Sequence, residues 1–313
     1  MNSKITTVLG DLPSNNLGIV DSHNHLWIEP VVGVKVPNPP VLNQYQKILS
    51  ELKSYKQAGG DAIVDCQPGG CGRNGNELAR LSRSSGATII ASTGFHRPIY
   101  YSPDYWLWHG SSDQIADHFI EEITVGLKET EAAETPVRAG FIKVACEESI
   151  NKTYQPGLLA SAQAAIQTGK IIEIHTEKGL HAAKILNYFI KLGVAPDQIV
   201  ICHMDKRPDI GLHQELARAG VALEYDTFYR IKYQPEEHLW ILITRMLNAG
   251  YEDHICLATD MAESMYWKTV GGGPGLDHFP GQIRKRLIEM EFPDHAIKKI
   301  MGANISRLLA NIY

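Results

Sequence analysis

Two histidines separated by one residue, His23 and His25, stand where an apolar run ends. In an extended strand, residues two positions apart point to the same side, so both imidazoles would project together from the C-terminal end of that strand. Neutral imidazoles that face one way suit a borderline cation such as zinc. Two hydrogen-bonded core rings would have the same spacing. Ligands at the ends of other strands must therefore decide between the two interpretations.

Four further polar residues lie in or at the end of apolar runs elsewhere in the chain. Lys143 lies within the run 141–145 (FIKVA), and His175, His203 and Asp260 each end a run of their own. A single histidine in such a place is often a hydrogen-bonded core residue, and an aspartate there can cap the next helix. A bare ammonium among apolar residues is harder to explain, because its desolvation is costly. The coincidence over five runs favours one shared site.

The runs that carry these residues belong to a regular series. Eight short β-branched runs alternate with longer amphipathic segments, which is typical of a parallel sheet built from βα repeats. In 313 residues, eight such units predict an α/β fold, a (β/α)8 TIM barrel, as a single domain over 1–313. Residues 1–16 are expected to cap the bottom of the barrel or to pair as a small hairpin. The predicted strands are 17–26, 61–67, 88–95, 140–146, 170–176, 198–204, 221–226 and 254–260.

Reacting groups in this fold lie at the C-terminal ends of the strands, where the six polar residues would converge. Their motifs, taken in order, resemble the phosphotriesterase-like family of the amidohydrolase superfamily. The resemblance covers nearly the whole chain, and as a set its motifs are highly specific. The matching segments are 6–10 (TTVLG), 21–25 (DSHNH), 139–145 (AGFIKVA), 174–177 (IHTE), 203–205 (HMD), 258–260 (ATD) and 300–309 (IMGANISRLL).

The resemblance implies a binuclear metal centre made of six side chains and two divalent ions. The lysine of such a centre bridges both ions after carbon dioxide has carboxylated its amine, so that it becomes an anionic oxygen ligand. Histidine and carboxylate ligands serve zinc, manganese, cobalt and iron alike, with zinc expected first. By this analogy N6-carboxylated Lys143 is the bridge, His23, His25 and Asp260 bind the more buried ion, and His175 and His203 bind the more exposed one.

The expected chemistry is hydrolysis without a covalent intermediate. Two divalent ions lower the pKa of a shared water and polarise the substrate, so no protein nucleophile is needed. Asp260 is placed to take the proton and pass it to the leaving group, and Lys143 would support it as the bridge. The predicted function is opening of a lactone or a related carboxylic ester. A phosphoester hydrolase and a catalytically silent metal-binding or ligand-binding barrel are the alternatives, and the complete set of six ligand positions argues against the second.

The loops after strands seven and eight resemble those of the family branch that hydrolyses lactones of sugar acids, some of them phosphorylated. Glu263 stands where that branch has an arginine, and a carboxylate repels a phosphate. We therefore expect either an uncharged or cationic substrate, or compensation by Arg97. The long connections 95–110 and 260–280 are expected to act as lids. The candidate substrate-binding residues are Arg97, Tyr229, Arg230, Lys232, Glu263 and Tyr266.

Composition narrows the class of protein further. A net charge of −5 without a basic stripe argues against nucleic acid, and no stretch has the apolar length of a signal peptide or a membrane helix. The five cysteines contain no C-x-x-C pair, which favours buried, reduced thiols and a cytoplasmic protein. Cys71, in a glycine-rich segment, is expected to be the accessible exception. The expected partner is a small-molecule substrate, with a homodimer suggested only by the resemblance.

Overall fold

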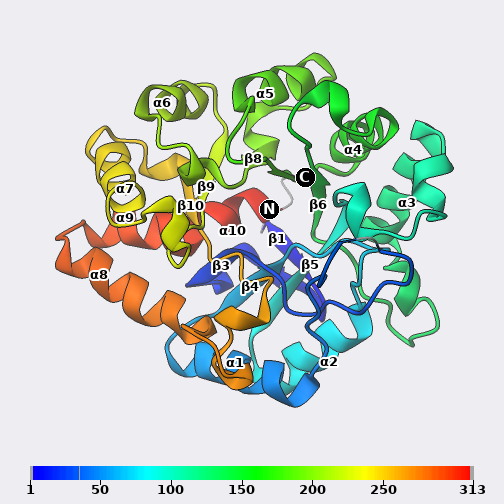
Figure 1. Ribbon diagram of the computed structural model, residues 1–313, viewed down its shortest axis with the longest axis horizontal. Coiled ribbons are helices and arrows are strands. Elements are labelled where there is room, and N and C mark those ends of the chain that lie inside the picture. Colours follow the sequence, from blue (N-terminus) through cyan, green and yellow to red (C-terminus); the bar gives the residue numbers. More distant parts are fainter. Residues whose placement is uncertain (1–2, 35, 311–313) are drawn as a thin grey trace.

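The structure is a computed structural model that describes residues 3–34 and 36–310. Eight parallel strands are paired in chain order, with helices around them (Figure 1). Each strand lies within one of the eight runs predicted from the sequence, so the α/β barrel is confirmed. The strands are β3 (Val20–Asn24), β4 (Ala62–Asp65), β5 (Thr88–Phe95), β6 (Phe141–Ala145), β7 (Ile172–His175), β8 (Ile199–Ile201), β9 (Ala222–Tyr225) and β10 (Ile255–Leu257).

Most of the helices form the outer layer of the barrel, whereas the C-terminal helix lies beside β1 at the bottom of the barrel. Their ends follow local sequence signals: the Asn74 side chain accepts a hydrogen bond from the backbone N–H of Glu77 at the start of α2, and Gly169 ends α4 in the left-handed conformation at φ 67°. The helices are α1 (Tyr45–Gln57), α2 (Gly75–Ser85), α3 (Ser112–Thr124), α4 (Gln155–Thr168), α5 (Ala182–Lys191), α6 (Ile210–Arg218), α7 (Leu239–Asn248), α8 (Arg284–Glu289), α9 (Asp294–Lys298) and α10 (Asn304–Leu309).

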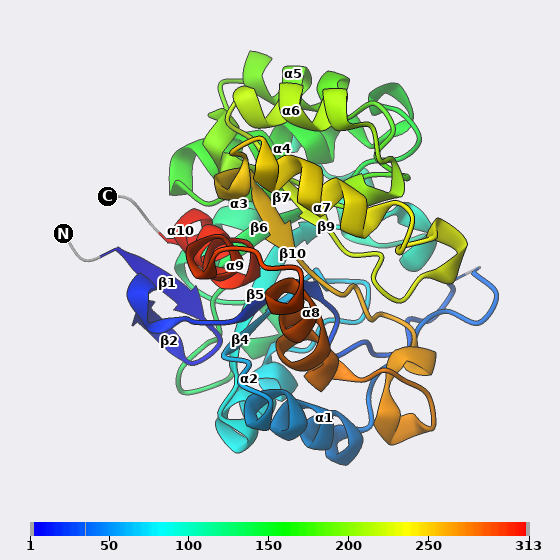
Figure 2. The ribbon, with the colours of Figure 1, turned by 90° about the vertical axis from the view of Figure 1, so that its left-hand side faces the viewer.

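An antiparallel hairpin, β1 (Lys4–Thr7) with β2 (Gly10–Pro13), packs across the N-terminal ends of the strands. The backbone N–H of Val8 donates to the carbonyl of Ile89 at the start of β5. The Lys170 ammonium, just before β7, donates to the Thr6 hydroxyl at 3.1 Å. Figure 2 shows the hairpin opposite the loops that follow β3 and β10. The hairpin thus covers the bottom of the barrel, and the loops surround the C-terminal ends of the strands.

The interior of the barrel changes from apolar to charged along the strands. Phe141 and Ala222 pack in an apolar layer with Ile5 of the hairpin. Two positions further along the same strands, Lys143 and Glu224 are fully buried. Side chains two apart share a face of a strand, so both layers point inward. A buried charged layer above an apolar floor is the setting for a polar site at the C-terminal ends.

The seam between the first and last barrel strands is made by polar contacts. The N–H of Asp260 donates to the carbonyl of His23 at 2.9 Å. The Thr259 hydroxyl donates to one carboxylate oxygen of Asp21 at 2.5 Å, and its N–H donates to the other at 3.1 Å. The pairing of β3 with β4 also shifts register between Asp21 and Asn24. Such an irregularity re-aims side chains, and this seam brings the histidine pair against Asp260.

Cys71 is a correction to the sequence analysis. It is only 3% exposed, and its thiol donates to the carbonyl of Pro68 at 3.2 Å. Burial raises the pKa of this thiol to about 12. All five cysteines are free and buried. Within the described part of the chain, none of the helices combines the length and apolar character that a membrane span requires.

Candidate metal centre

The first half of the candidate centre is the histidine pair of β3 facing Asp260 from the end of β10. The Nε2 atoms of His23 and His25 lie 3.8 and 3.7 Å from Oδ1 of Asp260. Their ring centroids are 5.5 Å apart. The two rings therefore point to the same carboxylate oxygen, as the spacing of the two histidines predicts.

Each ring of this pair is oriented by an acceptor on its other nitrogen. Nδ1 of His25 donates to Oε1 of Gln67, and Nδ1 of His23 donates to Oε1 of Glu224, both at 2.7 Å. These bonds put the proton on Nδ1 and leave the lone pair of Nε2 toward Asp260. Burial lowers the pKa of His25 to about 4 and holds the pKa of His23 well below its usual value. Both rings are thus neutral, as a metal ligand must be.

The second half of the centre is a pair of histidines from β7 and the end of β8. Nδ1 of His203 donates to Asp226, and Nε2 of His175 donates to Glu177 at 3.1 Å. The remaining nitrogens, Nδ1 of His175 and Nε2 of His203, lie 2.8 Å apart. Burial lowers the pKa of both rings. In the tautomer where each outer nitrogen donates to its carboxylate, two lone pairs face each other, an arrangement that a metal ion bound by both nitrogens would stabilise.

Asp260 lies between the two halves. Its Oδ1 faces His23 and His25, and its Oδ2 accepts from Nη2 of Arg230 at 2.8 Å. Arg230 also donates to the backbone carbonyl of Asp260 at 2.6 Å. Asp260 and His203 both have left-handed backbones, at φ 47° and 63°. This conformation is uncommon for non-glycine residues, although aspartate and histidine adopt it more readily than most. The arginine and the bond to His23 hold Asp260 in this geometry.

Lys143 is fully buried beneath the histidines. Its Nζ lies 3.3 Å from Nε2 of His23, 3.7 Å from the thiol of Cys202 and 3.2 Å from Oε1 of Glu173. Glu173 on the neighbouring strand pairs with this lysine, so the buried ammonium has an acidic partner. The lysine still lies where it can reach both halves of the site.

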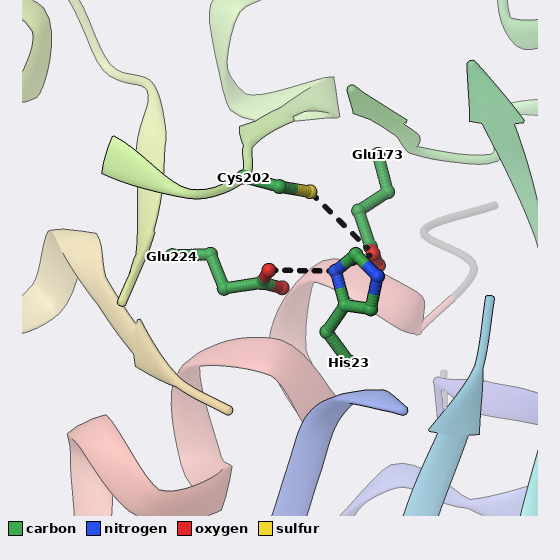
Figure 3. A group of neighbouring side chains, drawn as sticks. All are labelled: His23, Glu173, Cys202 and Glu224. Carbon is green, nitrogen blue, oxygen red and sulfur yellow. Dashed lines mark hydrogen bonds and ion pairs between the residues drawn. The ribbon is translucent and has the colours of Figure 1, made fainter. Parts of the chain in front are cut away.

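A further acidic group lies below the histidines. Figure 3 shows the ring of His23 reaching toward the carboxylates of Glu224 and Glu173, with the Cys202 thiol beside Glu173. Oε1 of Glu173 accepts from Cys66 at 2.8 Å as well as from Lys143. One oxygen of each carboxylate has no hydrogen-bond partner. Burial and the neighbouring Glu173 raise the pKa of Glu224, and a cation in the layer above would favour the ionised form of this carboxylate.

The donor set fits divalent metal ions. Among the described residues, three groups of side chains each have all their ligand atoms within 4.8 Å of one another, and two of these groups include Asp260. One contains His23 and His25, and the other contains His203 and Asp226. Neutral imidazoles with a carboxylate are typical ligands of zinc and its neighbours. The shared aspartate and the facing lone pairs support two adjacent cations.

A cavity of about 210 Å³ opens above this centre. His23, His25, His175, His203 and Asp260 line its inner end. The outer part is formed by the loop 28–40 after β3 and by residues of the β5, β9 and β10 loops. The cavity therefore connects the candidate metal ligands with the side of the barrel where a substrate can enter.

Two of the six predicted substrate-binding residues line this cavity, namely Arg230 and Glu263. Nη1 of Arg230 lies 3.5 Å from the carboxylate of Glu263. Tyr266 lies beside Arg230, whose guanidinium carbon is 5.3 Å from its ring centroid. The site geometry thus groups these three residues at one edge of the cavity.

The other predicted contacts lie elsewhere. Arg97 is paired with Glu147 at 3.0 Å and with Glu177 at 2.8 Å. Lys232 lies 5.2 Å from the ring centroid of its neighbour Tyr233. Tyr229 is half-buried, with its ring against His278. Of these described residues, none lines the cavity.

Sequence reasoning missed the acceptors that orient the histidines. Gln67 and Asp226 are the last residues of predicted strands, which is the same signal that identified His175 and His203. Glu224 is a carboxylate within an apolar strand, as conspicuous there as Lys143. Metal-binding histidines commonly donate their other ring N–H to such acceptors. The missed residues therefore complete the site rather than compete with it.

Similarity to known proteins extends over nearly the whole length of the chain. The phosphotriesterase family model matches residues 3–309. The phospho-furanose lactonase of Mycoplasmopsis synoviae is 29% identical over 320 residues, covering 97% of this chain and 91% of that protein. The aryldialkylphosphatase of Saccharolobus solfataricus is 25% identical over 266 residues, covering 82% and 81%.

Solved structures agree with this. A lactonase from Listeria monocytogenes superposes with a TM-score of 0.90 at 25% identity, covering 98% of this chain and 99% of its own. An amidohydrolase from Mycoplasma synoviae superposes with a TM-score of 0.90 at 28% identity, covering 99% and 92%. The barrel and its loops are thus similar to those of these proteins over nearly the full chain.

Proposed function

The chain belongs to the phosphotriesterase family, and on that premise we propose that it is a metal-dependent hydrolase that opens lactones. The observation that carries the proposal is the geometry of the four histidines: ring nitrogens of His175 and His203 face each other 2.8 Å apart, and His23 and His25 both face Asp260. The lactonase names of relatives in Mycoplasmopsis and Listeria support the lactone as substrate.

Two divalent ions, for which zinc is the expected metal, would lower the pKa of a water molecule and polarise the ester carbonyl. His23, His25 and Asp260 would hold the inner ion, and His175 and His203 the outer one. Lys143 lies beside His23 and would bridge the two as its N6-carboxylated form. The five free, buried cysteines support a cytoplasmic setting.

In this proposal Asp260 would accept a proton from the water that attacks the ester carbonyl. Burial by itself would raise its pKa, but Arg230, His203 and Lys206 lower it below the usual value, so the carboxylate is ionised and able to accept. Arg230 fixes Oδ2, and Oδ1 stays toward the histidine pair. The proton then passes to the leaving alkoxide. In a lactone that alkoxide becomes the hydroxyl of the ring-opened acid.

The lysine provides the test. We expect the purified protein to contain two metal ions per chain by elemental analysis, and a mass increase of one carboxyl group on Lys143. Lys143→Ala should lose metal and lactone hydrolysis together. Lys170→Ala, which removes a buried lysine at the opposite end of the barrel, is the matched control and should keep both. A Lys143→Ala variant with two metals and full hydrolysis would contradict the proposal.

A substrate screen distinguishes the alternatives. Because one relative is named an aryldialkylphosphatase, a phosphotriester is a second candidate substrate. The screen therefore contains γ-butyrolactones, an aryl ester and an aryl dialkyl phosphate. Lactones turned over in preference support the proposal, whereas turnover of the phosphotriester alone would replace it by phosphoester hydrolysis. Full metal content without any turnover would indicate a silent metal-binding barrel.

A further inference from the structure

We propose that the part of the substrate that fills the outer cavity is uncharged and apolar, so that the preferred substrates are lactones with a short alkyl substituent and not phosphorylated sugar lactones. The inference rests on the proposed lactonase function and adds the class of substrate. The cavity above the histidines has an apolar wall and two carboxylates, whereas a phosphate requires hydrogen-bond donors and positive charge.

The outer wall of the cavity is apolar. The loop after β3 contributes most of it, and Ala262 and Tyr100 face it from the β10 and β5 loops. Three of the wall residues are prolines, which have no backbone N–H to offer to an anion. A phosphate placed against this wall would lose hydration without gaining donors, which is costly. The wall residues of that loop are Ile28, Pro30, Val31, Val34, Pro39 and Pro40.

The charges of the cavity also disfavour an anion. Among the described lining residues, the permanent cation is Arg230, and its Nη2 is already bonded to the carboxylate and the carbonyl of Asp260. Two carboxylates, Glu29 and Glu263, line the cavity as well. Glu29 is held in place by Asn74 at 2.7 Å. A phosphate in the outer cavity would therefore meet two negative charges and an arginine already in use.

Three described basic residues of the loops around the cavity have contacts elsewhere. Arg97 is bound by two glutamates, as described above. Lys268, in the loop after β10, is paired with Asp277 at 2.6 Å. Lys232 lies by Tyr233 and does not line the cavity. Recruiting one of them to a phosphate would break an existing contact.

The cavity volume points to a small substrate. About 210 Å³ is less than the roughly 300–1,000 Å³ typical of sites for drug-sized ligands. A lactone ring with a short side chain suits this space. The ring would lie over the histidines, and the side chain would lie against the apolar wall.

The experiment compares four γ-butyrolactones that carry hydrogen, butyl, hydroxymethyl or phosphooxymethyl at the same ring carbon. We expect kcat/KM for the butyl compound to exceed that for the phosphorylated one by about 100-fold, since two well-packed methylenes would contribute about tenfold each and two carboxylates repel the phosphate. A preference for the phosphorylated compound would overturn the inference. If none of the four is hydrolysed by protein with full metal content, the proposed lactonase function itself fails.

Two neighbouring valines provide a matched pair of variants. Val34 lines the cavity, whereas Val32 does not and is 89% exposed. Val34→Asp should lower the ratio of butyl to unsubstituted turnover about tenfold, and Val32→Asp should leave that ratio unchanged. An unchanged ratio in Val34→Asp would contradict binding at this wall.

Lys35 lies in the same loop but outside the described residues. Lys35→Ala is therefore a separate arm of the experiment. A preference for the phosphorylated compound in the wild-type protein that disappears in Lys35→Ala would overturn the inference and assign the phosphate to that lysine. An equal preference of wild type and Lys35→Ala for the butyl compound over the phosphorylated one supports binding of the substrate at the apolar wall.

Discussion

Nδ1 of His175 and Nε2 of His203 lie 2.8 Å apart, and the other nitrogen of each ring donates to a carboxylate. Glu177 and Asp226 therefore direct two lone pairs at one point. This relationship is unfavourable in a protein without a cation, because neither ring has a proton to share. It is favourable in a metal-bound one, and it makes the stability of the fold depend on the metal.

Metal removal should accordingly destabilise the protein as well as inactivate it. At a metal concentration about 100 times Kd, binding contributes about 2.7 kcal/mol, which corresponds to a rise in Tm of roughly 4 °C for a chain of this size. Thermal unfolding after treatment with a chelator, and again after zinc is restored, measures the shift. Magnesium, which prefers oxygen ligands, should restore little of it. Identical Tm values with and without zinc would count against the site.

Asp226→Asn should weaken metal binding while the barrel stays folded. The carboxylate accepts the Nδ1 proton of His203, and an amide can turn its donor to the ring and favour the wrong tautomer. The loss expected for such a partner is about 10–100-fold in affinity. Competition with a zinc-binding dye measures it. Asp253→Asn, at an exposed aspartate on the opposite side of the barrel, is the control and should bind metal normally.

Arg230→Met should lower turnover more than it lowers metal content. The guanidinium holds both Oδ2 and the backbone carbonyl of Asp260, so without it the proton acceptor loses its orientation. A misplaced catalytic group costs about 100-fold. Steady-state kinetics with parallel elemental analysis separates the two effects. Arg230→Lys, which keeps the charge but not the paired donors, should recover part of the loss. Full activity in Arg230→Met would show that Asp260 is held without it.

Glu263→Gln should relax the discrimination against phosphorylated lactones. The carboxylate lines the cavity 3.5 Å from Arg230, so removing its charge lessens the repulsion of a phosphate and frees the arginine. We expect kcat/KM for the phosphorylated compound to rise about fivefold at low salt and less at about 0.5 M salt, where charges are screened. Glu289→Gln, on the exposed side of α8, is the matched control. The same fold-change for butyl and phosphorylated lactones would indicate a general effect instead.

Lys170 should make the folded protein more stable as pH rises above 8. Burial lowers its pKa to about 8 from an ordinary 10.5, so the folded state loses this proton before the unfolded state does. Between these values the unfolded state binds more protons, and the free energy of unfolding rises by up to about 3 kcal/mol. Below pH 8 this contribution is absent. Urea unfolding of wild type and Lys170→Met between pH 7 and about 10.5 measures the difference.

Lys53→Met, at an exposed lysine of α1, controls for the loss of a surface charge. We expect its pH dependence to follow that of wild type, whereas Lys170→Met should show a smaller rise. Parallel curves for wild type and Lys170→Met would mean that the buried ammonium titrates as it does in the unfolded chain.

Much of the fold follows from local patterns in the sequence. Short apolar runs such as 141–145 become strands because β-branched and aromatic side chains fill both faces of a buried sheet. Glycines such as Gly169 end helices where the backbone turns left-handed. The histidine pair at 23 and 25 points to one side because the period of a strand is two. These features need only a few neighbouring residues to be read.

The remaining features depend on which strands become neighbours. Glu224 is 201 residues from His23, and Glu173 pairs with Lys143 only because β7 lies beside β6. The same reason explains the burial of Cys71 and the engagement of Arg97 by Glu147 and Glu177. The sequence by itself determined the barrel and the residue types at its mouth. Tertiary structure decided their partners, since hydrogen bonds and ion pairs require distances of a few ångströms that only the closed barrel provides.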